Sequence, residues 1–146
     1  MMIPTKPAHI LLVEDNEGDI LLTLEAFEES KIITEISVVK NGQEALDFLN
    51  QNDSYTGAKK PDLILLDINL PILNGHEVLA NIKSDPLLKK IPVIMLSTSA
   101  NQKDIDLAYE YHTNSYVKKP LNMTDFLDAI LKIEAFWFQL STLARD

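Results

Sequence analysis

Short apolar runs alternate along this chain with segments of helical periodicity, and this alternation limits the possible folds more than any other feature. The predicted strands occupy residues 10–13, 35–39, 63–66, 92–96 and 115–118, and of these 10–13, 63–66 and 92–96 are apolar throughout. Continuous apolar runs of this length are typical of strands that are buried on both faces, as in a parallel sheet covered by helices. Because right-handed crossovers leave few other closures, the alternation predicts an α/β fold, a doubly wound (βα)5 five-stranded parallel sheet with helices on both faces.

Asparagine residues mark the predicted helix starts. In two places the motif is Asn-Gly followed by Glu at the third position after the Asn, at Asn41 and at Asn74. Asn-Gly alone would suggest a hairpin turn, but Glu at this spacing, followed by helical periodicity, indicates a capping box. The predicted capping residues are Asn16, Asn41, Asn74, Asn101 and either Asn122 or Thr124. We expect His76, on the first turn of the third helix, to lie at the surface.

Two of the apolar runs end directly in acidic residues. Residues 10–13 lead into Glu14 and Asp15, and residues 63–66 lead into Asp67. Alone, Asp67 is better explained as a polar strand terminus than as a working group. In open α/β sheets, however, the carboxyl ends of the strands form the edge where ligands bind, so the three carboxylates are expected to converge there. Like charges this close raise one another's pKa. A hard cation with oxygen ligands, Mg²⁺ by preference and Mn²⁺ as a substitute, is the simplest remedy.

Composition excludes several classes of protein. Thirteen basic residues against 22 acidic ones give a net charge of -9, which argues against a nucleic-acid surface. The absence of cysteine excludes disulfides and thiolate metal sites. No apolar run approaches the ~20 residues of a membrane span, and the N-terminal residues lack a signal-peptide core. We expect one cytoplasmic domain over residues 1–146, with no membrane partner, no output domain, and an extended final helix and tail from about residue 134.

The polar residues at the predicted strand ends form an ordered set. They are Glu14, Asp15, Asp67, Ser97 and Lys119. In this order and at these positions they resemble the receiver domain of two-component response regulators, over about residues 8–135. The resemblance implies the flavodoxin-like strand order 2-1-3-4-5. It also implies a Mg²⁺ site formed by Glu14, Asp15, Asp67 and the backbone carbonyl of Asn69.

The same resemblance implies the roles of the remaining site residues. Asp67 would be the phosphoacceptor, with Ser97 and Lys119 contacting the phosphoryl group, and Ser97 with Tyr116 would form the switch. The chain would then be a phosphoacceptor signalling protein that takes its phosphoryl group from a sensor histidine kinase and acts on a downstream protein, rather than an enzyme with its own substrate. Residues 74–100, the long loop before Asp62 and the C-terminal aromatic triplet are similar to the stand-alone response regulators of cyanobacterial phytochromes, which implies a phytochrome kinase as the donor.

Two other functions remain open at this point. An Asp-nucleophile phosphohydrolase would usually carry a second acid two residues after the nucleophile, where this chain has Asn69. A degenerate receiver, which has lost residues needed for phosphorylation, would act as a constitutive adaptor. In this chain every position needed for phosphorylation carries a suitable residue. Reaction with a small phosphodonor distinguishes the three functions. A hydrolase would turn the donor over, a receiver would form a stable adduct at one site, and an adaptor would form no adduct.

The aromatic triplet Phe136, Trp137 and Phe138 extends the final helix beyond the point where a minimal receiver would end. At about 100° per residue the three side chains spread over roughly 200°, which is wider than the apolar stripe that one helix buries. Trp137 is predicted to continue the core-facing stripe, and at least one phenylalanine should be exposed beside Leu140. We therefore expect a symmetric homodimer through the fourth helix, fifth strand and fifth helix, with these four residues in the interface. The alternative is that the fourth helix or the tail covers them.

Overall fold

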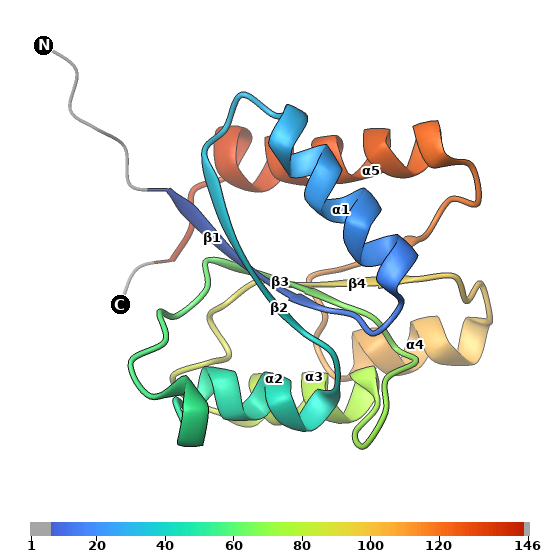
Figure 1. The fold of residues 1–146 in the computed structure, drawn as a ribbon. Coiled ribbons are helices and arrows are strands. Elements are labelled where there is room, and N and C mark those ends of the chain that lie inside the picture. The colour runs from blue at the N-terminus through green and yellow to red at the C-terminus, as the bar shows by residue number, and fades with distance from the viewer. Residues whose placement is uncertain (1–6, 145–146) are drawn as a thin grey trace, which may run out of the picture.

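The computed structural model describes residues 7–144, so the predictions made for the first six residues lie outside the described part of the chain. One sheet of five parallel strands has the order β2-β1-β3-β4-β5 (Figure 1). The strands are β1 (Ala8–Val13), β2 (Thr34–Val39), β3 (Leu63–Leu66), β4 (Val93–Ser97) and β5 (Ser115–Lys118). The predicted fold class and the strand order implied by the resemblance are confirmed.

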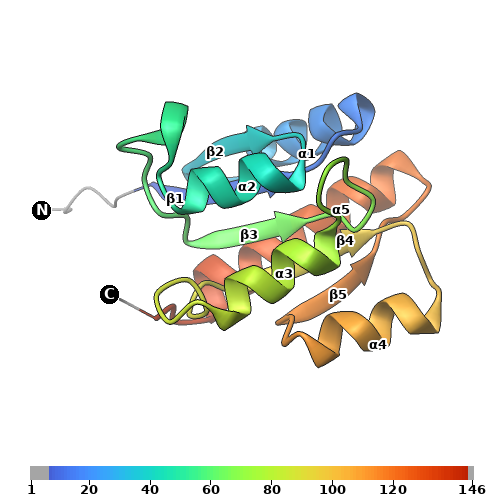
Figure 2. The same cartoon turned by 90° about the horizontal axis from the view of Figure 1, so that it is seen from below.

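In the part of the chain that the structure describes, five α-helices cover the sheet. They are α1 (Glu17–Glu29), α2 (Gly42–Leu49), α3 (Gly75–Ser84), α4 (Gln102–Glu110) and α5 (Met123–Ala135). Helices α1 and α5 lie on one face, and α2, α3 and α4 lie on the other (Figures 1 and 2). A 3-10 turn, η1 (Asp53–Tyr55), lies in the long loop between α2 and β3. Within residues 7–144, none of the helices is both long enough and apolar enough to cross a membrane.

All five helices begin with an asparagine cap, as the sequence predicted. The capping side chains of Asn16, Asn41, Asn74, Asn101 and Asn122 each accept a hydrogen bond from a backbone amide in the first turn. Helix α3 has the complete capping box, since the Asn74 amide also donates to the Glu77 carboxylate at 3.2 Å. The final helix is therefore capped by Asn122 and not by Thr124.

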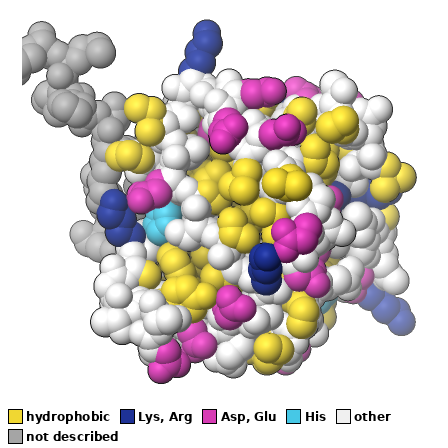
Figure 3. All heavy atoms as spheres, in the orientation of Figure 1, with side chains coloured by type: hydrophobic (Ala, Val, Ile, Leu, Met, Phe, Trp, Pro, Cys, Tyr) yellow, Lys and Arg dark blue, Asp and Glu magenta, His cyan; other side chains and the backbone are white. Residues whose placement is uncertain are grey.

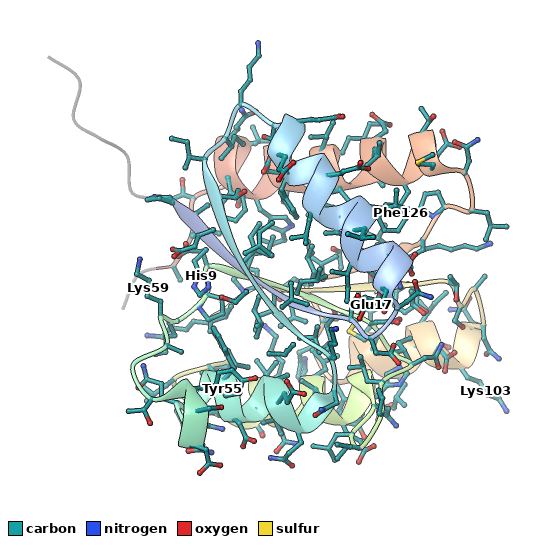
Figure 4. The ribbon with its side chains drawn as sticks, in the orientation of Figure 1. His9, Glu17, Tyr55, Lys59, Lys103 and Phe126 are labelled. Carbon is teal, nitrogen blue, oxygen red and sulfur yellow. The ribbon has the colours of Figure 1, made fainter. Side chains whose placement is uncertain are left out.

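The core has two halves, one on each face of the sheet. Alternate residues of a strand point to opposite faces, and in β1 Leu11 and Val13 pack with α2, α3 and α4 while Ile10 and Leu12 pack with α1 and α5. In Figure 4, Phe126 lies between α1 and α5. Every residue of β3 is fully buried, as expected for a central strand covered on both faces. Acidic side chains are spread over the face shown in Figure 3, in keeping with the net charge.

Three side chains differ in burial from what the sequence alone suggests. Helical periodicity would put Leu21 and Tyr109 on the buried faces of α1 and α4, but they are 64% and 50% exposed. Helix α4 buries only Ala108 completely, because it lies over β5, the edge strand of the sheet. The prediction of a surface position for His76 is wrong. The start of α4 covers this residue, and its Nε2 lies 2.9 Å from the Asp104 carbonyl oxygen.

The final helix does not continue as an α-helix through the aromatic triplet. Helix α5 ends at Ala135 and a π-helical turn, η2 (Phe136–Leu140), follows, closed by the Ser141 amide on the Phe136 carbonyl at 2.7 Å. Trp137 and Phe138 are half-buried and pack against the core between α1 and α5. Phe136 and Leu140 are 49% and 77% exposed. Trp137 thus continues the core-facing stripe as predicted, but the chain around it is wound more widely than an α-helix.

Candidate functional site

The register of the central strands brings the predicted acidic residues together. Val13 pairs with Leu66, so the residues that follow them, Glu14 and Asp67, emerge side by side at the carboxyl edge. One carboxylate oxygen from each of Glu14, Asp15 and Asp67 lies within 4.8 Å of the others. Glu14 and Asp67 are buried and Asp15 is exposed. The expected convergence of three carboxylates is therefore present.

Lys119, which follows β5, extends its ammonium group into this cluster. The Nζ atom contacts Glu14 Oε1, and it lies 2.9 Å from Asp19 Oδ2 and 3.4 Å from Asp67 Oδ2. The side chain is only 4% exposed. Sequence reasoning missed Asp19 as a member of the site. The position of Asp19 in the sequence could have identified it. Helix α1 begins directly after the acidic pair, so the first turn of α1 must lie over the same edge of the sheet.

Burial and charge act in opposite directions on the ionisable groups here. Burial raises the pKa of Glu14 to about 7, although its hydrogen bond from Lys119 acts to lower the pKa. For Lys119, burial alone would lower the pKa, but hydrogen bonds to Glu14 and Asp19 and the charge of Asp67 raise it above its ordinary value. Lys119 is therefore a full cation, while the carboxylates around it are incompletely neutralised.

The donor set fits a hard divalent cation. Glu14 Oε2 is fixed by the backbone amides of Asp15 and Asn16, at 3.1 and 3.2 Å, and Asp67 Oδ1 is fixed by the Ile68 amide at 2.8 Å. The carboxylates thus point in defined directions, and the nearby ligand atoms are all oxygen, the type that Mg²⁺ and Mn²⁺ prefer. Asn69 lies exposed two residues beyond Asp67, on the same edge of the sheet.

A glycine allows the start of α3 to approach the Asp67 backbone. The Gly75 amide donates to the Ile68 carbonyl at 2.8 Å, which folds the loop after β3 back on itself. A Cβ atom at Gly75 would lie 2.1 Å from the Asp67 carbonyl oxygen, closer than any real side-chain contact. The position of Asp67 therefore depends on a residue eight positions further along the chain having no side chain.

The second polar group of the site lies at the end of β4. Ser97 is completely buried, and its Oγ accepts a hydrogen bond from the Ser99 amide at 3.1 Å. Ser99 in turn accepts the Tyr116 hydroxyl on its carbonyl at 2.9 Å and donates through its own hydroxyl to Asp104 at 2.6 Å. Sequence reasoning named Ser97 and Tyr116 but gave no signal for Ser99 and Asp104. These two residues link the strand ends to α4.

The aromatic triplet is not part of this site. Trp137 and Phe138 border a broad depression of about 1040 Å³ that also includes His9 and Pro92, at the amino ends of β1 and β4. In Figure 4, Glu17 and Lys103, at the starts of α1 and α4, mark the side of the carboxyl edge, and His9 lies on the opposite side. The acidic site and the triplet are therefore separated by the length of the sheet.

Comparison with known proteins identifies the arrangement. The sequence model of the family "Response regulator receiver domain" matches residues 10–131. The chain belongs to this family. Response regulator Rcp1 of Synechocystis sp. is 44% identical to this receiver domain over 137 residues, which are 94% of this chain and 93% of that protein.

Solved structures of receivers match over nearly the whole chain. The phosphorylated cyanobacterial phytochrome response regulator RcpA is 46% identical, with a TM-score of 0.93 and coverage of 96% of this receiver and 100% of that chain. The Mn²⁺-bound form of Rcp1 is 43% identical, with a TM-score of 0.91 and coverage of 95% and 100%.

Proposed function

We propose that this receiver takes a phosphoryl group from the phosphohistidine of a sensor histidine kinase onto Asp67, in a reaction that requires Mg²⁺. The contact of the Lys119 ammonium with Asp67 and Glu14, inside a cluster of three carboxylates, carries the proposal. A cation beside a buried carboxylate suits phosphoryl transfer, in which positioning and neutralisation of charge provide most of the catalysis. The ligands of the metal would be Glu14, Asp15, Asp67 and the backbone carbonyl of Asn69.

The proposed step is a displacement at phosphorus. An Asp67 carboxylate oxygen forms the new P–O bond while the donor's P–N bond breaks, and the bonding pair returns to the imidazole nitrogen. Bound Mg²⁺ would supply positive charge to the phosphoryl oxygens. Lys119, already 3.4 Å from Asp67, would contact the same oxygens, and the Ile68 amide holds the other carboxylate oxygen of Asp67 in place.

The two alternative functions have less support. The hydrolase would need an acid where Asn69 stands, and Asp19, a further acid at this edge, is paired with Lys119 at 2.9 Å. The degenerate adaptor would lack a site residue, whereas Asp67, Ser97 and Lys119 are all buried at one edge. We therefore infer a phosphoacceptor signalling protein rather than an enzyme with its own substrate.

The output would pass through the connection between β4 and α4. A phosphoryl group on Asp67 would attract the Ser97 hydroxyl, which now accepts from the Ser99 amide. A shift of Ser97 would disturb Ser99, whose carbonyl holds the Tyr116 hydroxyl. Tyr116 could then change position, so that a local change of charge would bias a two-state element.

The partners follow from the relatives. RcpA is described as a cyanobacterial phytochrome response regulator, and 46% identity over 96% of the chain supports a phytochrome histidine kinase as the donor for this receiver as well. The setting would be cytoplasmic. The output would be contact with a downstream protein, because no nucleic-acid surface is expected at a net charge of -9.

A symmetric homodimer through α4, β5 and α5 is the proposed assembly. Its support is three exposed apolar side chains on these elements or directly after them, Tyr109 on α4 and Phe136 and Leu140 after α5, which are 50%, 49% and 77% exposed. Exposed apolar side chains that come together in a patch often mark interfaces. Phe136 and Leu140 would make the direct contacts, while Trp137 and Phe138 would support them from the core.

Intact mass spectrometry tests the central proposal. Wild-type protein incubated with acetyl phosphate and Mg²⁺ should gain one phosphoryl group, and Asp67→Asn should gain none. Glu14→Gln and Asp15→Asn should weaken the metal dependence without removing the nucleophile. An unchanged adduct in Asp67→Asn would overturn the assignment, and steady turnover without an adduct would favour the hydrolase.

A further inference from the structure

Ile72, five residues beyond Asp67, has a backbone conformation that its residue type disfavours. Its φ angle is 72°, in the left-handed region, where a β-branched residue is a genuine outlier. Its side chain is 73% exposed, so packing does not compensate for this conformation. Strained residues of this kind occur where the surrounding structure enforces them, and they cluster at functional sites.

The loop that carries Ile72 is held rigidly on both sides. The Pro71 carbonyl accepts the amides of Leu73 at 2.8 Å and of Gly42 at 3.4 Å. Gly42, at the start of α2, packs so closely that a Cβ atom there would lie 2.2 Å from the Leu73 carbonyl oxygen. The start of α2 therefore fixes the loop from one side and the start of α3 fixes it from the other, with Ile72 directed to solvent between them.

Ile72 stands at the edge of the sheet that carries the acidic site. Figure 2 shows the connection between β3 and α3 beyond the carboxyl end of β3, next to the start of α2. Three other large apolar side chains are exposed around this edge, Leu21 on α1 and Leu121 and Met123 at the start of α5, with exposures of 64%, 96% and 59%. A small phosphodonor needs none of these side chains, whereas a protein donor must bury the surface around Asp67 in order to reach it.

We propose that Ile72 is an apolar docking residue for the protein phosphodonor and distinguishes a protein donor from a small one. This inference rests on the proposed function. The occupant is the surface of the phosphohistidine-bearing protein next to its histidine, which must be apolar where it meets Ile72. Because the loop is already rigid, docking orders little additional chain, and the contact contributes to affinity without that entropic cost.

The test compares two donors whose P–N bond breaks in the same way. One is the phosphorylated histidine kinase module of a cyanobacterial phytochrome, and the other is phosphoramidate. The variant is Ile72→Asn, because asparagine tolerates a positive φ and lacks the apolar surface. The matched control is Ile33→Asn, since Ile33 is 69% exposed but precedes β2 at the opposite edge of the sheet.

The expected result is a loss confined to the protein donor. For Ile72→Asn, kcat/KM with the kinase module should fall about tenfold, the factor that corresponds to 1.4 kcal/mol, through a higher KM. The rate with phosphoramidate should remain within about twofold of wild type, since Ile72 does not contact the reacting atoms. The melting temperature should equal or exceed that of wild type, because the strain is relieved. Ile33→Asn should leave both reactions unchanged.

Several results would overturn the inference. These are an equal fall with both donors, no fall with the kinase module, a lower melting temperature for Ile72→Asn, or a wild type that reacts no faster with the module than with phosphoramidate at equal concentration. Failure of the proposed function gives a different result, because wild type would then form no Asp67 adduct with phosphoramidate either.

Discussion

The ammonium nitrogen of Lys119 lies 3.4 Å from Asp67 Oδ2 and simultaneously contacts the carboxylates of Glu14 and Asp19. One buried cation thus partly compensates the charge of three acids, which come from the end of β1, the first turn of α1 and the end of β3. If Lys119 is removed, buried carboxylates are left without a counter-charge, and leaving an uncompensated buried charge is strongly destabilising.

Lys119→Met should therefore lower the free energy of unfolding in the absence of metal by about 3 to 5 kcal/mol. Mg²⁺ should recover more stability in this variant than in wild type, since a cation that binds only the folded state stabilises it. Urea denaturation with and without Mg²⁺ measures both effects. Lys40→Met is the control, because the Lys40–Glu17 pair is exposed to solvent and its loss should change stability little. Equal Mg²⁺ effects in wild type and Lys119→Met would contradict the shared site.

Ser97→Ala should separate phosphorylation from its output. The alanine variant keeps Asp67, Lys119 and the acidic pair, so acetyl phosphate should still add one phosphoryl group. Without the hydroxyl, the Ser99 connection should not respond, and the NMR signals of the Tyr116 ring should stay at their unphosphorylated positions. Ser97→Thr, which retains the hydroxyl, should respond as wild type does. A normal Tyr116 shift in phosphorylated Ser97→Ala would place the coupling elsewhere.

Mg²⁺ should leave the fluorescence of Trp137 nearly unchanged. Trp137 borders the amino ends of the strands, while the acidic cluster lies at their carboxyl ends. The six residues of β1 at about 3.3 Å each separate the two ends by roughly 20 Å. Titration with Mg²⁺ while tryptophan emission is recorded is a direct measurement. A large saturable quench would contradict this geometry.

Phe136→Ala/Leu140→Ala should convert a dimer into a monomer without a loss of stability. Both side chains are largely exposed, so truncation removes interface contacts but little core packing. Phe138→Ala should instead lower the melting temperature, because Phe138 packs against the core. Sedimentation at micromolar concentration, with and without phosphorylation, measures the oligomeric state. The control is Leu87→Ala, because the Leu87 side chain is also largely exposed, at 68%. A wild-type monomer under both conditions would exclude the dimer.

Glu134→Gln should gain stability relative to wild type as the pH rises. Burial raises the pKa of Glu134 above its ordinary value of 4.5, although the Ser30 hydroxyl that donates to it acts in the opposite direction. The folded state therefore holds this proton after the unfolded chain has released it, and wild-type stability falls as pH rises from about 4.5 through the folded-state pKa. The glutamine variant does not lose this stability. The loss in wild type amounts to about 1.4 kcal/mol for each unit by which the folded-state pKa exceeds the unfolded-state pKa.

Urea denaturation at a series of pH values from acidic to neutral measures the difference for Glu134→Gln. Glu28→Gln, on the exposed face of α1, is the matched control for the loss of a carboxylate. A difference between Glu134→Gln and wild type that is constant with pH would mean that the pKa of Glu134 is the same in the folded and unfolded states, and would contradict the prediction.

The sequence determined the strands, the helix starts and the acidic edge. Residues 63–66 are apolar without interruption and the chain around them alternates strand with helix, which restricts the sheet to a parallel, doubly wound form. The asparagine caps act through hydrogen bonds to nearby backbone amides, so their signal is complete within a few residues. The convergence of Glu14, Asp15 and Asp67 followed from a general property of parallel sheets and needed no side-chain geometry.

Only the tertiary structure decided which groups meet across long separations. Asp19 joins Lys119 from 100 positions away, and the burial of His76 depends on the packing of α4 over α3. The left-handed conformation of Ile72 runs against its residue type and is enforced by the starts of α2 and α3. The sequence could not predict these features because they arise from how neighbouring elements pack, and no local pattern encodes which element will cover a given residue.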